Sequence, residues 1–307
     1  GSELVALRAF SGFNNTINRN SLLELLRFGQ IPAPLSIYEG ISKLPPGHRL
    51  SISLPLDPGL ELPTSRSWWQ LSSLIKSSYS KTFKSESEAL EQLELSLNQA
   101  VADQAVADVP LGTFLSGGID SSLVTALLQS QSNHRVRTFT ISFEETSFNE
   151  AVYARAVASY LGTDHEETLL TSADALALIP KLPQIFSEPF ADSSQLPTHM
   201  VCLAARKAGL TVALSGDGGD ELFAGYNRYF WGKRIWNRLA WLPFPLRQHL
   251  GHLISSIPTT TWDGIGMALP IAQLGHKAQK LSERLHDVKS SDDLYRSLMC
   301  EWRNPRS

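Results

Sequence analysis

The sequence has few cysteines, no long apolar run and little excess of charge of either sign. Two cysteines among 307 residues are too few for a disulfide framework, which suits a reducing compartment. No run reaches the roughly 18 to 20 consecutive apolar residues of a membrane-spanning helix. The formal net charge of −3 gives no broad electrostatic case for nucleic acid. We therefore expect a cytoplasmic protein without a nucleic-acid or membrane partner.

Several common binding signatures are missing as well. The eight histidines are scattered without the HxxxH spacing of a zinc site, so zinc is not expected. Neither the EF-hand calcium loop nor the GxxxxGKS/T phosphate loop occurs, and there is no internal repeat or low-complexity tract. A hydrophobic content of 42% over this length is enough for one large domain with an appendage.

The sequence does contain a stretch rich in glycine and hydroxyl groups at residues 115–122. An apolar run precedes it and an apolar-periodic segment follows, which predicts a strand, a tight loop and a helix. Glycine lets the backbone approach a phosphate, a helix start offers unpaired N–H groups, and a carboxylate can hold a divalent cation. The groups come from Ser116, Gly117, Gly118, Asp120, Ser121 and Ser122. We favour a phosphate-binding loop here over a structural turn.

A second glycine-rich turn, at residues 215–223, follows the apolar and β-branched run 210–214 and carries three carboxylates. Ligands of open parallel sheets lie at the carboxyl ends of the strands, so the two loops can face one site. Asp120 and Asp220 could then share one Mg²⁺ on a triphosphate. Acid-rich glycine turns are also common as plain surface loops. We favour the functional interpretation because both loops occur together.

The first loop resembles the pyrophosphate-binding loop SGG(I/L/V)DSS of the ATP pyrophosphatase superfamily. Together with the segment SGDGGDELFAGYNRY, it is similar to the asparagine synthetase family. Residues 31–47 resemble that family's junction between glutaminase and synthetase domains, and residues 188–198 resemble its substrate-side segment. The resemblance covers most of residues 3–230. It implies an α/β fold with an open parallel sheet and helices on both faces, like the adenine nucleotide alpha hydrolases.

The resemblance also implies a glutamine-dependent amide synthesis that uses ATP and Mg²⁺. The β-carboxylate of aspartate attacks the α-phosphorus of ATP, which gives β-aspartyl-AMP and pyrophosphate. Ammonia, delivered from glutamine by a separate glutaminase domain, then displaces AMP. The implied partners are aspartate, ammonia or glutamine, and that glutaminase domain, and a homodimer is left open.

Site roles follow from the resemblance by position. Leu115 and Ile141 would contact the nucleoside, while Ser215 and Gly216 would lie near the α-phosphate and ribose. Asp217 matches an acidic residue that helps ammonia attack, where many members carry Glu. From the residues alone, Ile141 is equally an ordinary core residue of a strand at 136–143. Candidates for binding aspartate, through the resemblance only, are Ser193, Ser194 and Thr198.

Two departures from the family pattern stand out. The family's glutaminase uses an N-terminal cysteine, whereas this chain begins Gly1-Ser2, which is typical of an expression-tag scar. Neither Cys202 nor Cys300 lies at an N-terminus, so we expect no glutamine hydrolysis. The family's catalytic lysine would fall beyond Ser307, and no lysine present is a candidate. We expect a fragment that binds ATP–Mg²⁺ without turnover.

The expected organisation is a glutaminase tail and linker at residues 1–62, followed by the ATP-binding domain at 63–307. Residues 55–83 are expected to form a connector. Capping boxes at Ser85/Glu88 and Ser147/Glu150 predict two helix starts. Strands are expected at 110–115, 136–143, 165–170 and 210–214. Helices are expected at 20–29, from 85 onward, and at 120–130, 149–161, 172–179, 195–208, 226–250, 271–285 and 291–302.

Two other classes remain compatible with the loops. One is a related amidotransferase or adenylating ligase that acts on another carboxylate, although the junction segment argues against the thiolation enzymes. The other is a non-catalytic nucleotide-binding module.

Overall fold

The computed structural model describes residues 1–52, 63–144, 149–268 and 274–302. Its internal contacts divide the chain into two units. The first comprises Gly1–Leu22 with Ile31–Gly219, and the second comprises Leu23–Gln30 with Asp220–Ser307. The predicted domain boundary at residue 62 falls on residues outside the described ranges, so it stays a prediction.

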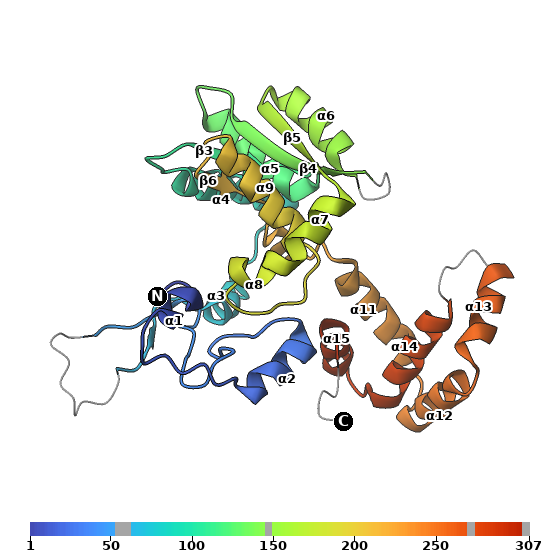
Figure 1. Ribbon diagram of the computed structural model, residues 1–307. Coiled ribbons are helices and arrows are strands. Elements are labelled where there is room, and N and C mark those ends of the chain that lie inside the picture. The colour runs from blue at the N-terminus through green and yellow to red at the C-terminus, as the bar shows by residue number, and fades with distance from the viewer. Residues whose placement is uncertain (53–62, 145–148, 269–273, 303–307) are drawn as a thin grey trace. The chain divides into compact units, whose positions relative to one another are not determined.

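The first unit contains a four-stranded parallel sheet of order β5-β4-β3-β6 (Figure 1). Its strands are β3 (Leu111–Phe114), β4 (Arg137–Phe143), β5 (Asp164–Leu170) and β6 (Val212–Leu214). Gly112 lies opposite Arg137 on one side and Ala213 on the other, so β3 is central. The chain moves outward from β3 to β4 and β5, then returns to the far side of β3. The predicted open parallel sheet is confirmed.

Helices cover both faces of this sheet. Leu111 packs into a cluster with residues of α4 (Glu86–Gln104) and α5 (Ile119–Gln131). Phe114, three positions along the same strand, packs instead against residues of α9 (Gln195–Lys207). Since side chains alternate along a strand, α5 and α9 lie on opposite faces, as Figure 1 shows. The α6 helix (Ala151–Leu161) contacts α5 and therefore shares its face.

Two predicted helix starts differ in detail from the structure. Ser85 accepts a hydrogen bond from the Glu88 amide, but the Glu88 carboxylate accepts from Lys84 rather than closing the box on Ser85. The α6 helix begins at Ala151, later than predicted, because the Asn149 side chain accepts from its amide. Ser147 lies outside the described residues. Gly162 ends α6 at φ 71°, as predicted.

The connector expected at residues 55–83 is partly regular, which corrects the prediction. It contains β2 (Arg66–Ser67), which pairs antiparallel with β1 (His48–Arg49), and helix α3 (Leu71–Ser78). Its serine-rich composition masked an apolar spacing of three and four residues at Leu71, Leu74 and Ile75.

The remaining helices are short in the first unit and longer in the second. Residues 226–250 form two helices rather than one, because Pro243 cannot continue the first. No helix in the described ranges is both long and apolar enough to cross a membrane. The first unit and its border contain α1 (Leu4–Arg8), α2 (Arg19–Phe28), α7 (Ser172–Leu178), η2 (Ile179–Lys181), α8 (Leu182–Ile185) and α10 (Gly219–Phe223). The second unit contains α11 (Asn227–Leu239), α12 (Phe244–Ser255), α13 (Thr259–Ala268), α14 (Leu274–Asp287) and α15 (Ser291–Met299).

Candidate functional site

The first glycine loop connects β3 to α5 and is held against α6. Gly117 has φ +83°, and a Cβ added to it would lie 2.6 Å from the Ala154 nitrogen in the first turn of α6. Only glycine combines that left-handed backbone with that close approach. The preceding Leu115 is 1% exposed and packs with Ala154 and Ala158. Any contact of Leu115 with a nucleoside would therefore involve its backbone rather than its side chain.

Two of the predicted hydroxyl donors brace the loop from within. Ser116 Oγ accepts from the Gly118 amide at 3.2 Å and lies 2.9 Å from Ser121 Oγ. Ser121 Oγ also accepts from the Ser116 amide at 3.2 Å and lies 3.3 Å from the Gly118 carbonyl oxygen. These contacts fix the loop shape, so in this structure both hydroxyls serve the loop itself.

Other donors in the loop remain unpaired. Helix α5 has Gly118 at its N-cap and no side-chain cap, so its first-turn amides have no intrahelical partner. Ser122 Oγ is shielded from solvent and has no hydrogen-bond partner among the described residues. A buried unsatisfied hydroxyl calls for an explanation such as a ligand, an ion or an ordered water. The uncapped start of α5 fits a phosphate group.

The second glycine loop follows β6 and lies directly against the first. A Cβ added to Gly216 would lie 2.6 Å from the Ser121 nitrogen, and one added to Gly219 would lie 2.5 Å from Asp120 Oδ2. The Ser215 hydroxyl donates to Asp217 Oδ2 at 2.9 Å, which shapes the turn and leaves Asp217 exposed. The structure thus brings the two predicted loops together.

The place where the loops meet is a switch point of the sheet. β3 and β6 are neighbours, with Thr113 opposite Leu214. The chain leaves β3 through α5 on one face and enters β6 from α9 on the other. In open parallel sheets, ligands bind in the crevice at the carboxyl ends of two such strands.

Two predicted site residues, Ile141 and Asp220, are not among the residues that join the two loops. Ile141, on β4, is partly buried and packs against the core cluster of Phe139 and Val201. Asp220 is the first residue of the second unit, so its role as a metal ligand stays a prediction. Across the described residues, no group of three or more His, Cys, Asp or Glu side chains is arranged to hold a metal ion. Mg²⁺ on a nucleotide usually needs only one or two carboxylates, because phosphates and waters complete its shell.

An ion pair that the sequence did not predict joins the junction segment to the substrate-side segment. Lys43 Nζ lies 2.6 Å from Glu188 Oε2 and donates to the Ile31 carbonyl at 2.7 Å. Glu188 Oε1 accepts from the Ile37 amide at 3.2 Å. No local pattern signals a contact between residues so far apart in the chain. The candidate aspartate-binding residues Ser193, Ser194 and Thr198 lie exposed at the start of α9.

The family model described as asparagine synthase matches residues 92–305, which include both loops. The chain belongs to the asparagine synthase family. A Methanocaldococcus jannaschii protein provisionally named asparagine synthetase (glutamine-hydrolyzing) 2 is 35% identical over 237 residues, which are 76% of this chain and 44% of that protein. Asparagine synthetase (glutamine-hydrolyzing) 1 of Bacillus subtilis is 29% identical over 213 residues, 69% of this chain and 32% of that protein.

The asparagine synthase match extends to proteins with another name. Amidase chyE of Penicillium rubens is 31% identical over 211 residues, 63% of this chain and 30% of that protein. The chain spans less than half the length of these three curated relatives. A solved NH3-dependent NAD synthetase from Campylobacter jejuni covers 65% of this chain with 97% of its own, at 10% identity and a TM-score of 0.31. That likeness is too low to support an argument.

Proposed function

We propose that this chain binds ATP–Mg²⁺ in the crevice between β3 and β6, as the carboxylate-activating part of an asparagine-forming enzyme. The observation that carries the proposal is the close approach of Gly216 to the backbone of Ser121 and Asp120, and of Gly219 to the Asp120 side chain. A nucleotide held at the start of α5 would also touch the second loop. The family match supports the same assignment.

In the proposed reaction, a carboxylate oxygen of aspartate attacks the α-phosphorus of ATP. The bond from that phosphorus to the bridging oxygen breaks, and pyrophosphate leaves with the electron pair. Ammonia nitrogen then attacks the acyl carbon, AMP leaves, and one proton is released. The amides at the start of α5 would bind the departing pyrophosphate, and its charge would be stabilised there by a dipole that needs no reorganisation.

The remaining roles are assigned to the second loop and to the carboxylates. Ser215 and Gly216 would lie beside the α-phosphate and ribose. Asp217, which is exposed and oriented by the Ser215 hydroxyl, would position ammonia and accept its proton. Bound Mg²⁺ would screen the phosphate charge, held by Asp120 with Asp220 as the second proposed ligand.

The test is an equilibrium titration with ATP–Mg²⁺, followed by isotope exchange between pyrophosphate and ATP with and without aspartate. We expect saturable ATP binding, and we expect net turnover to be absent. If the folded chain does not bind ATP–Mg²⁺, the proposal of a nucleotide site is wrong. A robust aspartate-dependent release of pyrophosphate would contradict only the expectation of no turnover.

The second candidate function is amide formation on a different carboxylate. The relative named as an amidase favours keeping it, because its 31% identity to this chain lies between the 29% and 35% of the two synthetases. Exchange that requires aspartate supports asparagine formation, whereas exchange with another carboxylate supports this candidate. ATP binding without exchange under any of these conditions indicates a nucleotide-binding module.

A further inference from the structure

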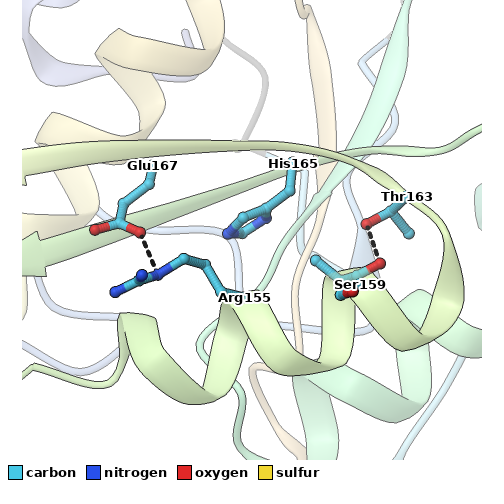
Figure 2. Close-up of a pocket in the computed structure, with 6 residues that line it drawn as sticks. Arg155, Ser159, Thr163, His165 and Glu167 are labelled. Carbon is cyan, nitrogen blue, oxygen red and sulfur yellow. Dashed lines mark hydrogen bonds and ion pairs between the residues drawn. The ribbon is translucent and has the colours of Figure 1, made fainter.

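A hollow that is separate from the glycine loops lies between α6 and the edge strand β5. It has a volume of about 480 Å³ and is lined by residues of both elements (Figure 2). The lining residues are Arg155, Ala158, Ser159, Thr163, His165 and Glu167. None of them has a role in the proposed nucleotide site.

The His165 ring lines the hollow and projects from β5 toward α6 (Figure 2). Its Nδ1 lies 2.8 Å from Thr138 Oγ1, which lies 3.1 Å from Thr163 Oγ1. Thr163 in turn donates to the Ala158 carbonyl at 3.5 Å. The Ala158 carbonyl can only accept, so Thr163 donates its one hydroxyl proton to it. Thr138 then donates its proton to Thr163, and the proton between Thr138 and His165 comes from Nδ1. The other nitrogen, Nε2, is left with a lone pair.

No donor among the described residues binds that lone pair. Nε2 is shielded from solvent and has no hydrogen-bond partner among the described residues. Burial lowers the pKa of His165, so the ring is neutral near pH 7 and Nε2 acts as an acceptor. A buried acceptor beside a hollow fits a ligand with an N–H donor.

Arg155 and Glu167, which both line the hollow, form an ion pair that a ligand can open. Arg155 Nε lies 3.0 Å from Glu167 Oε2, and the Arg155 side chain is 58% exposed. Exposed pairs of this kind contribute little to stability. An anionic ligand would meet Glu167, and a cationic ligand would meet Arg155. A zwitterion can satisfy both charges at once.

We propose that this hollow binds a free α-amino acid. Its carboxylate would pair with Arg155 and its ammonium group with Glu167, and a side-chain shift that uncovers Nε2 of His165 would let the ammonium group donate to it as well. Arg155 directly follows Ala154, against which the loop glycine Gly117 is packed. An occupant would therefore lie beside the turn of α6 that supports the phosphate loop.

The test titrates the chain with glycine, in the absence of ATP, and follows backbone amide shifts by NMR. Acetate, which carries only the negative charge of glycine, and methylammonium, which carries only the positive charge, serve as control ligands. We expect saturable shifts in α6 and β5 with glycine only, and at least tenfold weaker binding in Arg155→Met and in Glu167→Gln.

The matched controls are Arg135→Met and Glu166→Gln, which change an exposed arginine elsewhere and a carboxylate that pairs with Arg137 instead. Both should bind glycine within twofold of the parent chain. No saturable shift at tens of millimolar glycine, equal shifts with acetate alone, or unchanged affinity in both hollow variants would each overturn the proposal. Because ATP is absent, these outcomes do not depend on the nucleotide site.

Discussion

The contact between the two glycine loops makes Gly216→Ala the most informative substitution. The added Cβ would lie 2.6 Å from the Ser121 nitrogen and 2.9 Å from two atoms of Asp120. The nearest of these atoms belongs to the backbone, so no side-chain rotation relieves the clash. Ordinary contact needs about 3.5 Å, so the loops must separate by roughly 1 Å. The start of α5 and the second loop would then no longer fit one ligand together.

The expected magnitude follows from the cost of overpacking. Inserting a methyl group into a packed contact costs about 1–3 kcal/mol. In the free chain the loops can relax apart, but a nucleotide that bridges them would bring the strain back. If most of that cost appears in binding, ATP–Mg²⁺ affinity falls by roughly tenfold to a hundredfold, at about 1.4 kcal/mol per tenfold.

The assay is calorimetric titration with ATP–Mg²⁺, alongside circular dichroism to confirm the fold. Gly219→Ala should also weaken binding, because its Cβ would displace the Asp120 carboxylate that is proposed to hold Mg²⁺. Gly264→Ala is the matched control, since a Cβ there meets nothing within 4 Å. If folded Gly216→Ala binds ATP–Mg²⁺ within twofold of the parent chain, the two loops do not hold one nucleotide.

Three further outcomes are expected. Ser122→Ala removes a buried hydroxyl without a partner, so the free energy of unfolding should rise by about 1 kcal/mol in urea titrations, and a decrease would show that the hydroxyl is satisfied. Asp120→Asn should weaken ATP binding at least tenfold in Mg²⁺ but little in EDTA, with exposed Asp108→Asn unchanged; equal weakening in both would exclude Asp120 as a metal ligand. His165 has a pKa lowered by burial below its usual 6.5, so the unfolded chain takes up the proton first. Its contribution to stability is present above 6.5 and is lost as pH falls through the folded pKa, so the unfolding midpoint should drop more on acidification in the parent chain than in His165→Asn.

The local parts of the fold could be predicted from the sequence. The strands at 136–143 and 165–170 were predicted within one residue, because β-branched and apolar runs bounded by turns are local signals. The helix after the first loop was predicted from the helical spacing of its apolar residues, which is also a local signal. The α3 helix was missed because serine and proline near it are typical of a connector.

Contacts between distant residues could not be predicted. The ion pair of Lys43 and Glu188 depends on where two segments outside the helices and strands meet, and the sequence of neither segment predicts the other. The division at Gly219 was also out of reach, since amphipathic helices show which face is buried but not which helix covers it. The sequence likewise named three loop hydroxyls as equivalent donors. Only the coordinates separate Ser116 and Ser121, which brace the loop, from Ser122, which does not.

The strand order of the sheet explains why the second loop carries glycines. Ser116 and Ser215 follow two strands that are neighbours in space, although most of the sheet lies between them in the chain. Because successive parallel connections are right-handed, the chain can add a strand on the other side of β3 only by returning over the opposite face. The turn after β6 then lies directly on the start of α5. A side chain at Gly216 would clash with the backbone nitrogen of Ser121, so glycine there lets the second loop lie against the start of α5.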